Sequence, residues 1–294
     1  MESGGRSGQG HGGAARWLLL DCGNSALKWA LSGVDIDADA DAAPGASPCF
    51  VSAGREELGQ VDWPERLEAA WRRAGVPPAA AYGCSVASSD VGAAIDAVAR
   101  RVFGVRPCWK AAAARFVAAD IELTSGYRDP SRLGADRWHA MIAARVATPG
   151  LPLVVVNAGT ATTVDAVTMH GRFEGGVIAP GMRLMLDSLA RGTARLPRAD
   201  GAWSPSPDNT DDAITTGVLE AQAGLVERRV RRFSRACGRP VRLVLAGGFA
   251  SLLAPHVADA LGPGELAGPP SIEDNLVLRG VHCRARFEAR GDCR

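Results

Sequence analysis

LLLDCGNSALK (Leu18–Lys28) and VVVNAGTATTV (Val154–Val164) are two stretches of this chain that follow one pattern. Each begins with a short apolar run typical of a buried strand, passes through a turn with Gly near its centre, and resumes as a second strand. They lie about 136 positions apart. We therefore predict an α/β fold made of two related halves, each opening with a hairpin whose turn faces a shared cleft.

Working outward from the two hairpins, periodicity and turn residues predict the other elements. The expected strands are Trp17–Asp21, Ser25–Leu31, Ala81–Ala87, Leu151–Val156, Ala161–Val167 and Val241–Leu245. The expected helices are Pro64–Ala74, Val91–Val102, Leu133–Ala147, Met182–Arg191 and Asp211–Ser234. We expect a loop at Asp35–Ser47, and helix or loop after the Gly247-Gly248 turn. The halves would span residues 16–149 and 150–294, after a Gly-rich, disordered leader at residues 1–15.

Composition excludes several classes of protein. The formal net charge of +1 argues against a nucleic-acid-binding surface. The seven cysteines are scattered without a C-x-x-C pair, which argues against a zinc site or a disulfide framework and favours a reducing compartment. The sequence has no signal-peptide core, and no apolar run approaches the roughly 18 residues of a membrane span. We expect a cytoplasmic protein that binds neither nucleic acid nor membrane.

The first hairpin has the residues of a phosphate-binding turn. Gly23 lets backbone N–H groups approach a polyphosphate, and Asp21 at the strand end can hold magnesium directly or through water. Asn24 and Ser25 are neutral hydrogen-bond donors, and Lys28 adds a positive charge. An ordinary hairpin would explain this stretch equally well.

The second hairpin strengthens the functional interpretation, because a matching turn at Thr160 would complete a two-sided phosphate clamp. Between the hairpins, Asp136 and Arg137 follow Gly134 at the start of a predicted helix. A carboxylate at a helix N-terminus stays ionised and suits a base that accepts a proton from an alcohol. Arg137 offers a planar fork for a carboxylate. The alternatives are a helix-start Asp, a solvated Arg, and a turn-forming Asn157.

Five blocks occur together in the chain: DxGNSxxK at Asp21–Lys28, GYxxPxxLGADRW at Gly126–Trp138, GTATT at Gly159–Thr163, GGxIAPG at Gly175–Gly181 and GTAxLP at Gly192–Pro197. In this combination the sequence resembles type III pantothenate kinase, over roughly Trp17 to Val281. The resemblance implies the duplicated ribonuclease H-like fold of the actin/sugar-kinase superfamily. It also implies ATP-dependent phosphorylation of pantothenate to 4′-phosphopantothenate, the first step of coenzyme A synthesis.

The resemblance assigns roles by position. Asp136 would accept the proton of the pantothenate 4′-hydroxyl, and Thr210 would contact substrate across the interface of a homodimer. The other residues expected to bind pantothenate are Tyr127, Gly134, Ala135 and Arg137. Those expected to bind ATP are Asp21, Cys22, Gly23, Asn24, Ser25, Ala26, Leu27, Lys28 and Thr160, with the Gly247-Gly248 turn on the adenosine side.

The resemblance also implies cofactors, with one departure. Mg²⁺ would accompany ATP near Asp21. Many family members have Asp at the position of Asn157, where the carboxylate helps to bind a monovalent cation such as K⁺ or NH₄⁺. Asn keeps an oxygen ligand but loses the charge, so the monovalent cation requirement is open.

Two other functions remain open from the sequence. One is a protein of the same fold that binds nucleotide or pantothenate without turnover and acts as a regulator. The other is a kinase for a different small hydroxy acid or sugar. The complete set of Asp21, Lys28, Asp136 and Arg137 argues against the first.

Overall fold

A computed structural model describes residues 17–33, 50–75, 77–118, 121–193, 196 and 198–289. The first sheet contains β1 (Trp17–Cys22), β2 (Ala26–Ser32), β3 (Phe50–Glu57), β4 (Ala80–Ser85) and β5 (Pro107–Trp109). The second contains β6 (Arg115–Ala118), β7 (Ile121–Ser125), β8 (Leu153–Ala158), β9 (Ala161–Val167), β10 (Arg172–Pro180), β11 (Arg242–Ala246) and β12 (Ser271–Ile272). The helices are α1 (Trp63–Ala74), α2 (Ser89–Phe103), α3 (Ala135–Ala147), α4 (Met182–Gly192), α5 (Thr210–Cys237), α6 (Ala250–Ala260) and α7 (Leu276–Ala289).

The two sheets repeat one topology. The first has the strand order β3-β2-β1-β4-β5, and the second contains the matching order β10-β9-β8-β11-β12. In both, the first three strands of the half are antiparallel neighbours, and the last two are added parallel to the first. The hairpin β1–β2 therefore corresponds to β8–β9, which confirms the predicted duplication and α/β class.

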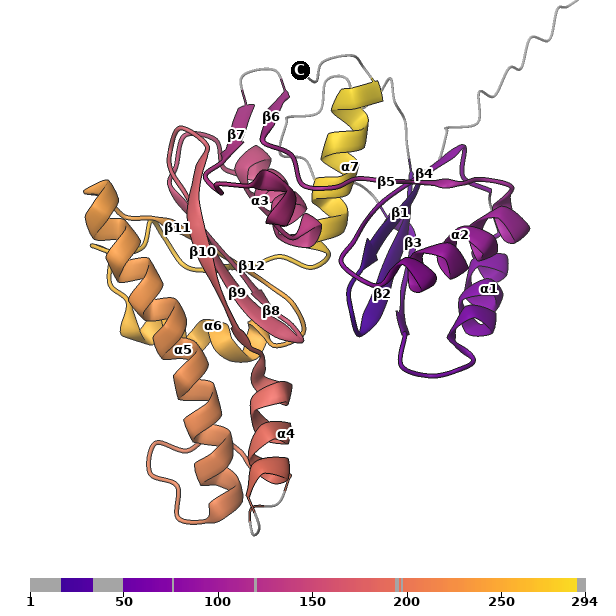
Figure 1. Ribbon diagram of the computed structural model, residues 1–294. Coiled ribbons are helices and arrows are strands. Elements are labelled where there is room, and N and C mark those ends of the chain that lie inside the picture. Colours follow the sequence, from indigo (N-terminus) through magenta and orange to yellow (C-terminus); the bar gives the residue numbers. More distant parts are fainter. Residues whose placement is uncertain are drawn as a thin grey trace, which may run out of the picture.

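The two halves lie side by side, with helices on and between their sheets (Figure 1). Helices α1 and α2 cover the outer face of the first sheet, whereas α3 and α7 lie between the sheets. Helices α4 and α5 extend together beyond the second sheet as a projecting pair. No helix in the described part of the chain has both the length and the apolar character needed to cross a bilayer.

The alternation of side chains along β1 decides which residues face the second half. Leu18 and Leu20 belong to the core beneath α1 and α2, where the Trp29 ring meets Trp71 edge-on at 6.4 Å. Leu19 belongs to the core shared with α3, α7 and the second sheet. Because successive side chains point to opposite faces, Asp21 lies on the same face as Leu19, toward α3.

Helices α3 and α7 pack closely between the halves. A Cβ at Gly280 of α7 would lie 3.0 Å from the Cα of His139 of α3 and still closer to its carbonyl, so only glycine fits there. The His139 side chain is fully buried, its Nδ1 is 2.7 Å from the Ala135 carbonyl oxygen, and burial lowers its pKa to about 4. This close packing fixes the first turn of α3, which contains Asp136, between the two sheets.

The predicted elements are present, with ends that differ by up to three residues. Strands β3, β5, β6, β7 and β10 were not predicted, and β12 lies in a stretch where helix or loop was expected, so that expectation was wrong there. The leader at residues 1–15 and the loop Asp35–Ser47 fall outside the described residues. Strands β6 and β7 precede residue 150 but belong to the second sheet, and the division of the chain at residue 149 stays a prediction.

Candidate active site

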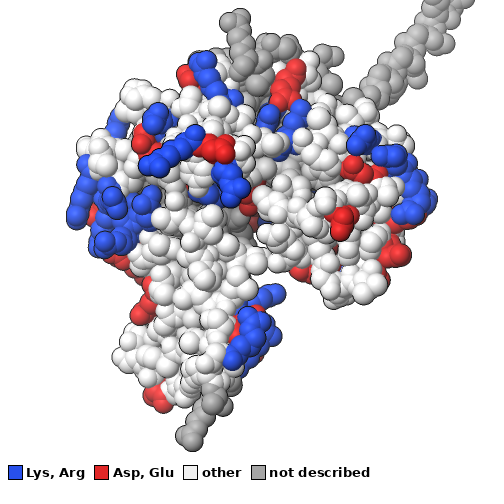
Figure 2. All heavy atoms as spheres, in the orientation of Figure 1, with Lys and Arg blue, Asp and Glu red and all other residues white. Residues whose placement is uncertain are grey.

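The two hairpin turns meet, as the duplicated pattern requires. The hydroxyl of Thr160, in the β8–β9 turn, donates a hydrogen bond to the hydroxyl of Ser25, in the β1–β2 turn, at 3.0 Å. These residues are 135 positions apart and come from different sheets. The surface is notched between the two lobes (Figure 2). The turns therefore form a continuous polar edge between the two halves.

Three charged residues form a row across the first sheet. Asp21 pairs with Lys28 across β1 and β2, and Lys28 pairs with Arg55 across β2 and β3. Directly opposed residues share a sheet face, so all three lie on the face toward α3. Burial raises the pKa of Asp21 to about 6, with Asp136 adding to the rise and Lys28 and Arg55 opposing it. Asp136 thus lies close enough to Asp21 for its charge to act there.

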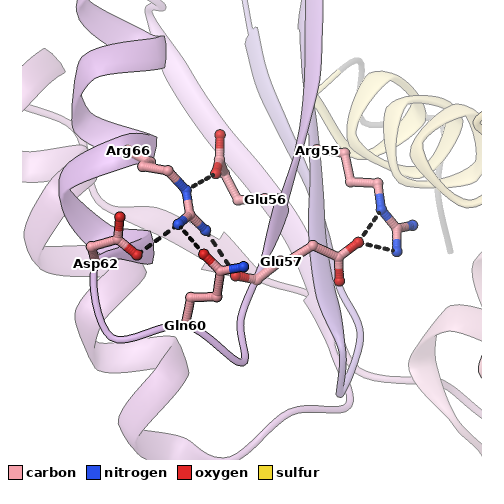
Figure 3. Close-up of polar contacts among 6 residues, drawn as sticks. All are labelled: Arg55, Glu56, Glu57, Gln60, Asp62 and Arg66. Carbon is pink, nitrogen blue, oxygen red and sulfur yellow. Dashed lines mark hydrogen bonds and ion pairs between the residues drawn. The ribbon is translucent and has the colours of Figure 1, made fainter.

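Arg55 is a residue that the sequence analysis missed. Its Nε and Nη2 donate to Glu57 Oε1 at 3.0 and 2.8 Å, and both side chains are half exposed. Figure 3 shows this pair pointing away from Arg66 of α1, whose guanidinium instead joins Glu56 and the turn before α1. No sequence signal marked Arg55, because β3 itself was not predicted. In the structure the alternating burial along β3 places Arg55 and Glu56 on opposite faces.

Several residues predicted to bind ATP can do so only through their backbone. The side chains of Cys22, Ala26 and Leu27 are buried in or beside the core. The turn is closed by a hydrogen bond from the Gly23 N–H to the Ala26 carbonyl at 3.0 Å. Asn24 at its tip is exposed. The polar groups offered by this turn are therefore main-chain N–H groups, Asn24 and Ser25.

Glycines from two other motifs support the second turn. The Gly181 N–H donates to the Thr160 carbonyl at 3.0 Å, and a Cβ at Gly181 would lie 2.6 Å from that oxygen. Gly247, at φ +96, packs against the β8 end, where a Cβ would lie 2.8 Å from Asn157 Oδ1. The GGxIAPG motif and the Gly247-Gly248 turn are thus placed around the turn that holds Thr160.

We expect Gly181→Ala to displace the Thr160 turn, because the new methyl group would overlap backbone atoms that cannot rotate away. The KM for ATP should rise on the order of 10-fold, as for loss of a contact worth about 1.4 kcal/mol. Steady-state kinetics with varied ATP would measure the change. Gly217→Ala is the control, because that glycine is exposed in α5 with open space at the Cβ position. An unchanged KM for ATP in Gly181→Ala would contradict this role.

Asp136 occupies the first turn of α3. Its Oδ1 accepts a hydrogen bond from the Arg137 N–H at 2.8 Å, and its side chain is partly exposed. A Cβ at Gly134 would lie 2.6 Å from this oxygen, so glycine leaves room for the carboxylate. The charge of Asp136 raises the pKa of both Asp21 and Asp165. The charge of Asp136 therefore acts on both of these buried carboxyl groups.

Arg137 is buried, and its main partner is a residue that the sequence analysis missed. Its Nε lies 3.2 and 3.1 Å from the two carboxylate oxygens of Asp165 in β9, and its Nη2 also bonds to Asp165. Nη1 donates to the hydroxyl of Tyr127 at 2.9 Å. The alternative of a solvated Arg137 is therefore wrong. The signal for Asp165 was a lone acidic residue among the apolar residues of a predicted strand.

The residues near the turns are compatible with Mg²⁺, although the described residues there do not form a cluster of acidic ligands. Mg²⁺ is usually held by one or two carboxylates together with substrate phosphates and water. Asp21 supplies such a carboxylate, whose ionised form is disfavoured by burial and would be stabilised by a divalent cation. No group of three His, Cys, Asp or Glu suitable for a metal occurs among the described residues. Asn157 lies at the end of β8, facing the Gly247 turn.

Thr210 is exposed at the start of α5 and does not join the other predicted residues within this chain. In Figure 1, α5 begins at the end of the projecting α4–α5 pair that lies away from α3. The helix start is well formed, because the Asn209 side chain accepts a hydrogen bond from the Asp212 N–H at 2.9 Å. The role of Thr210 in a second copy stays a prediction.

Comparison with known proteins identifies the family. A family model described as type III pantothenate kinase matches residues 17–232. The chain belongs to the type III pantothenate kinase family. A type III pantothenate kinase of Laribacter hongkongensis is 42% identical over 271 residues, covering 92% of this chain and 98% of that protein. One of Cupriavidus taiwanensis is 39% identical over 290 residues, with the same coverage of 92% and 98%.

The fold also has a relative among solved structures. A protein of Campylobacter jejuni described as a conserved Baf family transcriptional activator has a TM-score of 0.53 at 15% identity. The match covers 94% of this chain and 99% of that one. At this identity the likeness supports the arrangement of the two halves, and nothing beyond the fold. The residues matched by the pantothenate kinase family model include both hairpins and α3.

Proposed function

We propose that this chain transfers the γ-phosphate of ATP to the 4′-hydroxyl of pantothenate, the first step of coenzyme A synthesis. The observation that carries the proposal is the junction of two turns from different sheets, Ser25 to Thr160. Asp21 lies near the end of the strand before the first turn, and the charge of Asp136 acts on it. Phosphoryl transfer requires positioning and charge stabilisation more than covalent chemistry. A site between two halves, lined by main-chain N–H groups and cations, can supply both.

On the ATP side, the two turns would hold the phosphates from opposite faces. Lys28 and Arg55 are like charges directly opposed on neighbouring strands. Glu57 pairs with Arg55, and a phosphate group would supply a further anion beside them. Asp21 would hold Mg²⁺, which neutralises developing charge on the phosphate oxygens when it is bound. The hydroxyls of Ser25 and Thr160 would exchange their mutual hydrogen bond for bonds to phosphate oxygens.

On the pantothenate side, Asp136 would accept the proton of the attacking hydroxyl, while Gly134, Ala135 and Tyr127 would line the pocket. Arg137 would bind the substrate carboxylate with the donors that it has left. Of its five N–H groups, three are used by Asp165 and Tyr127, which leaves one on each terminal nitrogen. These two donors can contact a carboxylate without breaking the internal pair.

Two further parts of the proposal concern ions and assembly. A monovalent cation would bind near Asn157, whose amide oxygen can coordinate it while contributing no charge. Thr210 would reach the pantothenate pocket of a second copy in a homodimer. A K⁺ titration of activity and the mass of the protein in solution would test these two statements separately.

Arg137→Ala is expected to raise the KM for pantothenate on the order of 10–100-fold, with a smaller effect on kcat. The reason is that a charge-assisted contact to the substrate carboxylate is present in the ground state as well as in the transition state. Kinetics with varied pantothenate at saturating ATP would measure the split. A fall in kcat at unchanged KM would instead assign Arg137 to the transition state.

An ATP-consumption assay against pantothenate and a panel of small hydroxy acids and sugars tests the proposed function. Product analysis by mass spectrometry should show a phosphate added to pantothenate. Turnover of another alcohol in preference to pantothenate would favour a kinase for a different small hydroxy acid or sugar. Binding of pantothenate and nucleotide without turnover would favour the regulator that the sequence left open.

A further inference from the structure

The Arg137–Asp165 ion pair is among the most deeply buried charge pairs in the described part of the chain. The Arg137 side chain is 4% exposed and that of Asp165 is 2% exposed. The guanidinium contacts the carboxylate along its Nε and Nη2 edge, so the pairing has two points of contact. Two-point pairing fixes the plane of the guanidinium as well as its position.

The surroundings allow this arrangement and few others. A Cβ at Gly176 of β10 would lie 2.6 Å from Arg137 Nη2 and closer still to Asp165 Oδ1, so glycine provides the space for the pair. The guanidinium carbon lies 5.7 Å from the ring centroids of both Tyr127 and Phe173. Strand β9 supplies the carboxylate, β10 the space and the residues after β7 the phenol, so the pair is fixed by three separate segments.

Stability alone gives little reason to keep such a pair. Removing two charges from water is costly, and well-packed apolar residues of similar volume often stabilise a protein as well or better. The pair lies at the first turn of α3, and Arg137 follows the proposed base Asp136 directly. Its edge toward Asp165 is saturated, whereas each terminal nitrogen keeps one free N–H.

We propose that Asp165 is a positioning residue for the substrate: it binds the Nε edge of Arg137 and so directs the remaining N–H groups toward the carboxylate of pantothenate. The inference rests on the proposed role of Arg137 as the carboxylate-binding residue. Gly176 and Tyr127 complete the arrangement, the first by leaving space and the second by accepting from Nη1. Asp165 itself touches no reacting atom.

Asp165→Asn tests this in the full-length protein. Asn keeps the shape but loses the charge and one acceptor, so the KM for pantothenate should rise about 10-fold or more, while the KM for ATP changes less than about 2-fold. Glu273→Gln is the matched control, because Glu273 pairs with Arg279 in a partly buried ion pair outside this site. Equal rises in both KM values would indicate general loss of structure and would overturn the proposal.

A double-mutant cycle separates positioning from folding. Each single variant, Asp165→Asn or Arg137→Ala, leaves one buried charge without its partner and can destabilise the protein, whereas Arg137→Ala/Asp165→Asn removes both charges. If Asp165 acts through Arg137, the double variant should show the pantothenate KM of Arg137→Ala alone, a non-additive result. A further rise in the double variant would refute the proposal. Wild-type protein that does not phosphorylate pantothenate would refute the proposed function instead.

Discussion

Asp136→Asn is expected to reduce turnover by on the order of 10²–10⁴-fold, the usual contribution of a general base. The amide cannot accept a proton from the attacking hydroxyl, although it can still accept the Arg137 N–H bond at the start of α3. The fold should therefore survive. Single-turnover measurements of phosphate transfer at saturating ATP and pantothenate would give the change in the chemical step directly.

Asp62→Asn is a suitable control for Asp136→Asn. Asp62 is an exposed carboxylate before α1 that pairs with Arg66, on the outer side of the first sheet. Its loss should leave turnover unchanged. Near-normal turnover in Asp136→Asn would exclude that residue as the base and would require a different proton acceptor beside the joined turns.

Asp21→Asn should stabilise the protein at neutral pH while it removes most activity. In the folded state the pKa of Asp21 is raised from 3.8 to about 6 because the carboxyl is buried. The folded state therefore binds this proton more tightly than the unfolded state, so the stability associated with Asp21 is lost as the pH rises from about 4 to above 6. Asn does not ionise, so the variant keeps its stability as the pH rises.

The expected gain in the free energy of unfolding is on the order of 3 kcal/mol at pH 8 and close to zero at pH 4, since one pKa unit corresponds to about 1.4 kcal/mol. Denaturant unfolding of both proteins at the two pH values would measure it. The affinity for magnesium-ATP should fall about 10–100-fold, as for loss of a metal-associated carboxylate. Equal stabilities at pH 8 would show that burial of the ionised Asp21 carboxyl group does not destabilise the folded protein.

The joined turns at Ser25 and Thr160 confirm the prediction that the two hairpins meet, and the charge of Asp136 acts on Asp21. These features could be predicted because they depend on local signals. A short apolar run ending at Asp or Asn and Gly specifies a strand followed by a turn, whatever surrounds it. The repeat of that signal then specified two halves with matching sheets.

The sequence by itself determined the two hairpins, helix α3 and the repeated strand–turn–strand pattern, because strand, turn and helix signals are encoded in neighbouring residues. Only the tertiary structure decided what each side chain meets. Asp165 binds Arg137, which is 28 positions away in the sequence, and the register of β2 and β3 places Arg55 opposite Lys28. Pairing between strands and packing between sheets depend on residues far apart in the chain, and no local pattern specifies them.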